Sequence, residues 1–114
     1  MTLIYKIAPQ ALWRAAEALA AFDGAPVDLE DGFIHFSTAA QLRQTAAKHF
    51  AGERDLLLVA VDAERLGDAL KWEPSRGGDL FPHLYGKLQL AHVQRLDPLP
   101  LRHDGTHDFT GLIP

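Results

Sequence analysis

The stretch Asp55-Leu-Leu-Leu-Val-Ala-Val-Asp62 indicates the fold most strongly, because it places six consecutive apolar residues between two acids. A run of this length is short for a helix and lacks the polar–apolar alternation of a strand with one face in water. Strands that are covered on both faces are continuously apolar in this way. The sequence therefore predicts a buried central strand over Asp55–Asp62.

A strand and a helix are predicted before this central strand. Leu3–Ile7 contains β-branched and aromatic residues typical of a strand. The helix that follows begins at Pro9, whose missing N–H is not needed in a first turn, and ends near Asp23-Gly24. Its expected apolar stripe consists of Leu12, Ala16, Leu19 and Ala20, with Trp13 and Phe22 flanking it.

A second strand and helix are predicted between that helix and the central strand. Alternate residues of Phe33–Ser37 share a face, which groups Phe33, His35 and Ser37. Thr38-Ala-Ala-Gln41 has the sequence of a capping box, which satisfies free amides at a helix start. The helix is predicted over Ala39–Phe50, with one apolar face formed by Leu42, Ala46 and Phe50.

The elements after the central strand are predicted to be shorter. Glu64–Leu70 has room for a turn or two of helix, and Pro74–Asp79 is a Gly-rich loop. Strands are expected at Leu70–Glu73, Leu80–Tyr85 and Leu88–Val93, whereas Leu99–Pro114 is interrupted by Pro and Gly. We expect an α/β protein of the α+β kind, a single domain over residues 1–114 with a curved mixed or split β-sheet and two main helices.

Composition excludes several classes of function. The chain has 114 residues and no cysteine, which rules out thiol catalysis and Cys-type zinc sites. Its net charge is −4 and its 11 Lys and Arg residues are scattered, so we expect no non-specific binding to nucleic acid. The start of the sequence does not resemble a signal peptide, and no apolar run is long enough to span a bilayer. We therefore expect a cytoplasmic protein that does not bind membranes.

The first candidate site is Gly32–Thr38, where a predicted strand ends and a helix begins. His35 and Ser37 project from the same face, beside the unpaired N–H groups of a helix N-terminus. This combination suits a phosphate or a ribose hydroxyl. The alternatives are that His35 is a hydrogen-bonded histidine at the edge of the core and that Thr38 is only a cap.

The second candidate site is Trp72–Gly86, which is dense in polar and aromatic residues. Arg76 precedes two glycines, so a guanidinium and exposed backbone amides can approach one anion together. On a strand, His83 and Tyr85 share a face with Phe81, and an imidazole beside a phenol suits proton transfer or a bound heterocycle. The alternative is a structural loop fixed by pairs of Arg76 with Glu73 or with Asp79.

The loop His103–Asp108 contains two imidazoles and two carboxylates, which are ligands for a hard or borderline metal. Nothing in the surrounding sequence predicts a rigid scaffold for it. A solvated turn is the preferred interpretation, and no metal site is predicted.

The motifs Asp31–Thr38 and Lys71–Gly86, with Tyr5-Lys6-Ile7 and Thr45–Phe50, resemble the bacterial domain of unknown function numbered 952. The resemblance covers nearly the whole chain, and the family has no established activity. It is usually grouped with the ADP-ribosyltransferase-like superfamily, whose members resemble a split sheet with an NAD cleft. That superfamily uses three motifs, which here look like Tyr5-Lys6, His35-Phe36-Ser37 and Phe81–Tyr85.

Two of these motifs depart from the superfamily pattern. Lys6 stands in place of His, and no Glu is present in Phe81–Tyr85. RNA 2′-phosphotransferases resemble the same fold and also lack that Glu. The departures therefore argue against ordinary ADP-ribosyl transfer without excluding catalysis.

The resemblance implies a nucleotide-site protein of ADP-ribosyltransferase-like fold, with group transfer on NAD or a phosphorylated nucleotide as the expected reaction. NAD is the candidate ligand or substrate. His83 would be the acid–base group, His35 and Ser37 would orient a ribose, Lys6 and Arg76 would balance phosphate charge, and Tyr85 would pack on a base. The full set of expected site residues is His83 and His35 as catalytic, and Tyr5, Lys6, Ser37, Thr38, Glu73, Arg76 and Tyr85 as ligand-binding.

Two other functions remain open at this point. A non-catalytic small-ligand-binding or sensor domain would explain the missing Glu and His. A metal-dependent hydrolase would use His83, His103 and His107.

Overall fold

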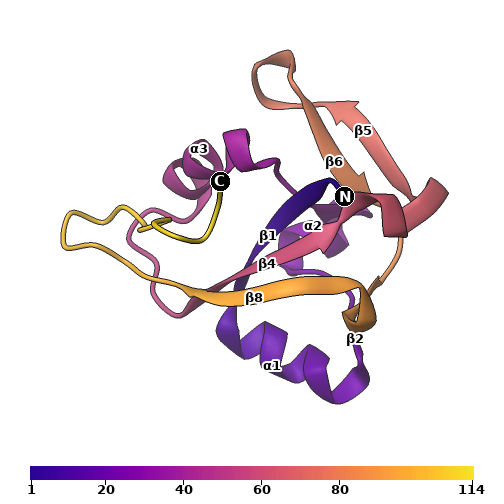
Figure 1. The fold of residues 1–114 in the computed structure, drawn as a ribbon, viewed down its shortest axis with the longest axis horizontal. Helices are drawn as coiled ribbons and strands as arrows, with labels where there is room; N and C mark the ends of the chain where they lie inside the picture. Colours follow the sequence, from indigo (N-terminus) through magenta and orange to yellow (C-terminus); the bar gives the residue numbers. More distant parts are fainter.

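The computed structural model describes residues 1–114 apart from the side chain of Arg76. The predicted central strand is confirmed as β4 (Leu56–Asp62), in which every residue is buried. It lies between β1 (Leu3–Pro9) and β8 (Val93–Leu99) and is antiparallel to both (Figure 1). This sheet is the framework on which the other elements pack.

A second three-stranded sheet contains both candidate segments. Its strand order is β3 (Ile34–His35), β6 (Leu80–Leu84) and β5 (Leu70–Pro74), and both ladders are antiparallel. A bridge joins it to the first sheet, because the backbone N–H groups of Tyr5 and Ser37 each donate to the other residue's carbonyl oxygen at 2.8 Å. The expected mixed or split sheet is therefore split, and all of its ladders are antiparallel.

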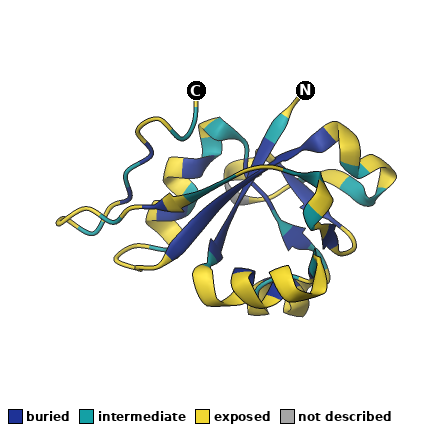
Figure 2. Ribbon diagram, turned by 60° about the horizontal axis from the view of Figure 1, so that its bottom comes forward, coloured by how far each residue is buried: buried dark blue, intermediate teal, exposed yellow. Residues whose placement is uncertain are grey.

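Two helices cover opposite faces of the central sheet. The helix α1 (Gln10–Leu19) buries Trp13 and Ala16 in one apolar cluster with alternate residues of β4, namely Leu57, Val59 and Val61. The helix α3 (Ala39–His49) buries Leu42 and Ala46 in the other, with Leu56, Leu58 and Ala60. Figure 2 shows the buried strands between these helices, whose outer surfaces are exposed. Because both faces of β4 are covered, its sequence is continuously apolar.

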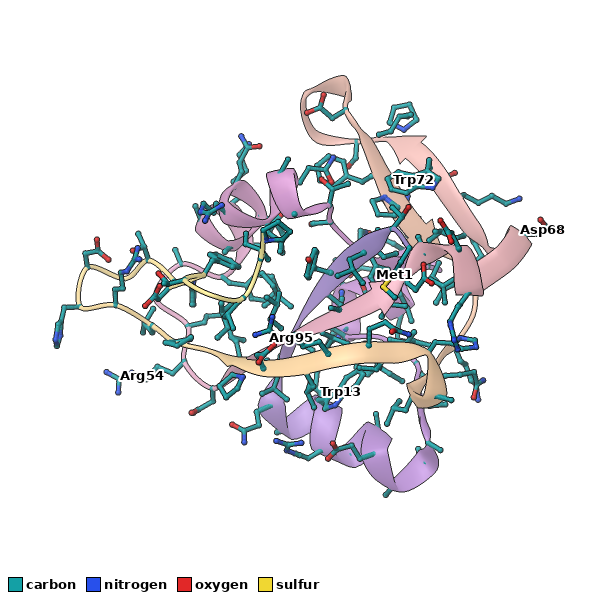
Figure 3. The ribbon with its side chains drawn as sticks, viewed as in Figure 1. Met1, Trp13, Arg54, Asp68, Trp72 and Arg95 are labelled. Carbon is teal, nitrogen blue, oxygen red and sulfur yellow. The ribbon has the colours of Figure 1, made fainter. Side chains whose placement is uncertain are left out.

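The first helix differs from the prediction in its ends and its buried stripe. Pro9 belongs to β1 and precedes the first helical residue. The helix ends at Leu19, because Ala20 is left-handed (φ 57°) and the short strand β2 (Ala21–Phe22) follows. The side chains of Leu12 and Leu19 are exposed, and Trp13 takes the buried position instead, against the ring of Phe22 at 5.3 Å (Figure 3). The large indole ring determines which face of the helix is buried.

One helix and one long strand were not predicted. The helix α2 (Pro26–Asp31) has only six residues, too few to show a period of 3.6. The single strand predicted over Leu88–Val93 is instead three successive elements. These are β7 (Leu88–Gln89), which pairs with β2, then a 3₁₀ turn over Leu90–His92, and then the first residue of β8. Pro98 argues against a strand in the sequence, because proline cannot donate a ladder hydrogen bond. It is tolerated here because β8 is an edge strand.

The remaining boundaries differ from the predictions by a few residues. Only Ile34–His35 of the predicted strand Phe33–Ser37 is in β3, β6 ends at Leu84, and α3 ends at His49. A turn or two of helix was predicted over Glu64–Leu70, and the segment Ala63–Ala69 forms 3₁₀ turns. No helix in the described part of the chain has the length and apolar character needed to cross a membrane.

Candidate active site

The two candidate segments lie side by side in the second sheet. His35 on β3 is the ladder partner of His83 on β6, and their ring centroids are 5.4 Å apart in an edge-on arrangement. Phe33 packs against both rings, at 4.6 Å from His35 and 4.1 Å from His83. The strand pairing thus forms one site from segments that are separated by almost fifty positions in the sequence.

A cavity of about 580 Å³ opens beside these histidines. Its walls come from β1, α2, α3 and the second sheet, and Phe36, Phe50 and Phe81 supply its aromatic lining. The predicted site residues in its lining are Tyr5, Lys6, His35, Ser37 and His83. A larger hollow of about 750 Å³ lies between Gln10, Asp55 and Leu99; its lining includes His103 but none of the residues predicted for a nucleotide site. Its lining includes Arg54 at the outer edge of the molecule (Figure 3). The smaller cavity is the better candidate site, because both His35 and His83 line it.

Asp28 on α2 is a buried carboxylate that contacts two residues of the cavity lining, Lys6 and His35, although no sequence signal singled it out. Its side chain is buried, and Lys6 Nζ lies 2.8 Å from Oδ2 and 3.0 Å from Oδ1. The backbone N–H of Ala25 donates to Oδ2 at 2.8 Å. The lysine that was expected to meet a phosphate is therefore engaged with an internal carboxylate.

His35 is held by two carboxylates. Its Nδ1 lies 2.6 Å from Asp28 Oδ1 and its Nε2 lies 3.0 Å from Asp31 Oδ2, while its backbone N–H also donates to Asp28 Oδ1. Both ring nitrogens are occupied in this arrangement, so His35 has no free nitrogen for a ligand. His35 is therefore a residue of the cavity wall held in place by its carboxylate partners, and its ring is not free to act as an acid or base.

These contacts determine the ionisation of the buried pair. Burial alone would raise the pKa of Asp28, but the hydrogen bond from His35 and the charge of Lys6 outweigh it and lower the pKa to about 2. Burial lowers the pKa of Lys6, and Asp28 opposes that shift. Asp28 is therefore an ionised carboxylate whose partners neutralise it inside the protein.

His83 is buried and differs from His35 in using one ring nitrogen. Its Nδ1 lies 2.8 Å from Oε1 of Glu73 on β5, and the hydroxyl of Tyr85 donates to the same oxygen at 2.7 Å. The hydrogen bond from His83, then that from Tyr85, lowers the pKa of Glu73, and the bond to Glu73 raises the pKa of Tyr85. Within the described part of the chain, Nε2 of His83 has no hydrogen-bond partner.

The other predicted site residues have different places. Ser37 Oγ lies 3.0 Å from Thr45 Oγ1 on α3, and burial raises the pKa of the Tyr5 phenol, with Arg95 opposing. Thr38 precedes α3, and its backbone N–H donates to the side chain of Gln41 at 3.0 Å. Thr38 does not line the cavity, which favours its interpretation as a cap.

Tyr85 and Glu73 lie behind His83 rather than in the cavity lining. Tyr85 is 44% exposed, with its ring against Phe33, so it is not placed to stack on a ligand in the cavity as expected. The side chain of Arg76 lies outside the described residues, and its backbone belongs to a 3₁₀ turn over Arg76–Gly78.

The histidines of the C-terminal segment do not join this site. His107 is buried, and its Nε2 lies 2.9 Å from the carbonyl oxygen of Glu53. Asp104 accepts hydrogen bonds from the backbone and side chain of Thr106, so the loop satisfies its own polar groups. Among the side chains that the structure describes, no group of three or more His, Asp or Glu is placed to hold a metal ion. His83 lines the smaller cavity and His103 the larger hollow, so the structure does not bring together the histidines proposed for the metal-dependent hydrolase.

The family model described as a protein of unknown function, DUF952, matches residues 7–96. The chain belongs to the DUF952 family. The match spans both His35 and His83 and so confirms the family resemblance of these motifs. No curated protein matches the chain.

Solved structures of another protein, CC0527 from Caulobacter crescentus, are similar to this DUF952 chain. One crystal structure is 52% identical over 96% of both chains, with a TM-score of 0.93. A crystal structure of a double mutant of CC0527 is 50% identical over 96% of both chains, also with a TM-score of 0.93. A solution NMR structure of CC0527 is 53% identical over 96% of this chain and 94% of that one, with a TM-score of 0.86.

Proposed function

We propose that this DUF952 protein binds NAD or a phosphorylated nucleotide in the cavity beside β3 and β6 and catalyses a group transfer in which His83 moves a proton. The observation that supports this most directly is the pairing of His35 with His83 on one cavity wall. A buried imidazole with one nitrogen held by a carboxylate, and the other without a partner among the described residues, has the arrangement of a general base.

The proposed fold is ADP-ribosyltransferase-like, and the order of the strands supports it. The three segments that resemble the superfamily motifs are adjacent: Tyr5 bridges to Ser37, and the β3 segment pairs with β6. Two separate three-stranded sheets meet at that bridge, as in a split sheet. The cavity lies where these segments meet.

The contacts refine the roles proposed for the ligand-binding residues. Because the Lys6 ammonium is paired with Asp28, Arg76 is the remaining proposed partner for phosphate. Ser37 lies in the cavity lining, where its hydroxyl can reach a ribose. A base or nicotinamide ring would pack on Phe81 or Phe50, which line the cavity, instead of on Tyr85.

Ligand-observed NMR with NAD, ADP-ribose, AMP and a 2′-phosphorylated nucleotide tests the binding step. At least one of the four should bind, and His83→Gln should weaken that binding by about tenfold, the loss expected for one hydrogen bond to a charged or polar ligand group. The matched control is His92→Gln, a half-buried histidine that lines neither cavity, which should bind as the wild type does. Binding of none of the four would overturn the proposal.

Product analysis with the nucleotide that binds tests the catalytic step. The ligand is incubated with the protein and a panel of hydroxyl, amine and phosphate acceptors, and transferred groups are detected by mass spectrometry. Product formation that is lost in His83→Gln supports the transferase. Saturable binding with no product from any acceptor would instead identify a ligand-binding or sensor domain.

A further inference from the structure

We propose that Glu73 is a positioning residue that holds His83 as the Nδ1–H tautomer, so that Nε2 presents its lone pair to the cavity, and that Tyr85 keeps Glu73 in place. This inference rests on the proposed function only in assigning a proton transfer to His83. The geometry of the three side chains stands without it.

The hydrogen bond with Glu73 determines which ring nitrogen of a neutral His83 carries the proton. An ionised carboxylate accepts hydrogen bonds and cannot donate one. Glu73 Oε1 lies 2.8 Å from Nδ1, so a neutral His83 ring must place its proton on Nδ1. The second ring nitrogen is then the unprotonated one, which is the form that a general base requires.

Strand register explains why this contact forms. In the β5–β6 ladder Glu73 is opposite Phe81, and His83 is two residues further along β6. Diagonal neighbours of this kind project from the same face of a sheet, within reach of long side chains. Phe33 stacks on the His83 ring at 4.1 Å with 30° between the planes, which limits rotation of the imidazole.

Tyr85 gives the carboxylate a second donor. Its hydroxyl lies 2.7 Å from the same Oε1 atom, while its ring contacts Phe33 at 5.2 Å. The Glu73 side chain is 38% exposed and would otherwise sample several rotamers in water. The phenol therefore selects the rotamer in which Oε1 faces His83.

The contrast with His35 shows why His83 is the base. Both nitrogens of His35 face carboxylates, Asp28 on one side and Asp31 on the other. Glu73 occupies only one nitrogen of His83. A second carboxylate at Nε2 would remove the lone pair that the reaction needs.

Long-range ¹H–¹⁵N NMR of ¹⁵N-histidine-labelled protein, at a pH of about 8.5 where an ordinary imidazole is neutral, reports the tautomer. The His83 signals are assigned by their loss in His83→Gln. Wild type should show the Nδ1–H tautomer, and Glu73→Ala should shift the tautomer ratio about tenfold toward Nε2–H. Tyr85→Phe should shift it less, and the exposed control Glu17→Ala should leave it unchanged. An Nε2–H tautomer in wild type, or an unchanged ratio in Glu73→Ala, would overturn the inference.

This experiment separates the inference from the proposed function, because it needs no ligand. A backbone ¹H–¹⁵N spectrum shows whether Glu73→Ala is folded, and Glu73→Gln, which keeps an acceptor oxygen, should retain more of the wild-type tautomer than Glu73→Ala. If the tautomer result is as expected and no nucleotide binds, the proposed function fails and the role of Glu73 remains.

Discussion

At the scale of single residues, the buried pair of Lys6 and Asp28 has the largest energetic consequence. Both side chains are almost fully buried, at 6% and 0% exposure, so solvent cannot replace a missing partner. Removing one member of such a pair leaves a buried charge without its counterion and costs about 3–5 kcal/mol. The pair is therefore a structural element next to the cavity, whose lining includes Lys6.

Asp28→Asn tests this, and we expect it to lower the free energy of unfolding by about 3–5 kcal/mol, measured by urea denaturation. Lys6→Met combined with Asp28→Asn should cost less than the sum of the two single changes, because it removes both charges. Asp23→Asn, at the exposed pair with Lys87, is the matched control and should cost less than about 1 kcal/mol. Additive single effects would show that the two charges do not stabilise each other.

The pKa of Asp28 also predicts a window of acid sensitivity. The folded pKa of about 2 lies below the ordinary value of 3.8, so the unfolded chain binds a proton first as the pH falls. The stabilisation is present above about pH 4 and is lost as the pH falls through about 2, with a total of about 2 kcal/mol. Unfolding free energies of wild type measured from pH 6 to 2 should fall by more than those of Asp28→Asn. Parallel curves for the two proteins would contradict the assignment.

At the scale of elements, α1 depends on a single large side chain. Trp13 fills the space between the helix, the central sheet and Phe22, and its Nε1 is buried without a hydrogen-bond partner among the described residues. Trp13→Ala should cost about 3–5 kcal/mol through the cavity it creates, whereas Trp13→Phe should cost only about 1 kcal/mol because it also removes the unpaired N–H. Thermal unfolding of both variants measures this. A loss for Trp13→Phe as large as that for Trp13→Ala would contradict this account, because Phe fills most of the cavity that Ala leaves.

The elements that the sequence predicted best are those whose residue pattern favours one kind of secondary structure over the others. The strand β4 and the helix α3 were predicted within one residue at each end, β4 from a continuous apolar run and α3 from a capping box followed by one apolar face. The helix α2 was missed because six residues show no period, and Asp28 was missed with it. Nothing in the local sequence distinguishes a buried acid from a solvated one when its partner, Lys6, is 22 positions away.

At the scale of the whole molecule, the sequence predicted the two segments of the candidate site but did not predict that they pair in one sheet. His35 and His83 were selected for their neighbours in sequence, and the β3–β6 ladder that joins them is a long-range pairing. Their different hydrogen-bond partners come from two separate places in the chain, Asp28 and Asp31 on α2 for His35 and Glu73 on β5 for His83. Roles of this kind are set by tertiary structure and could not be derived from spacing.

The position of the cavity between both sheets predicts how a bound ligand would act on the whole chain. At a concentration of about 100 times its Kd, a ligand that binds only the folded state raises the free energy of unfolding by about 2.7 kcal/mol. Since β1 and the second sheet both line the cavity, hydrogen exchange should slow at Tyr5 and Ser37, whose amides form the bridge between the sheets, as well as at His83. Exchange measured by NMR with and without the ligand, at equal saturation in wild type and His92→Gln, checks this. Slower exchange confined to the loop near Arg54 would place the ligand in the larger hollow instead and separate it from both histidines.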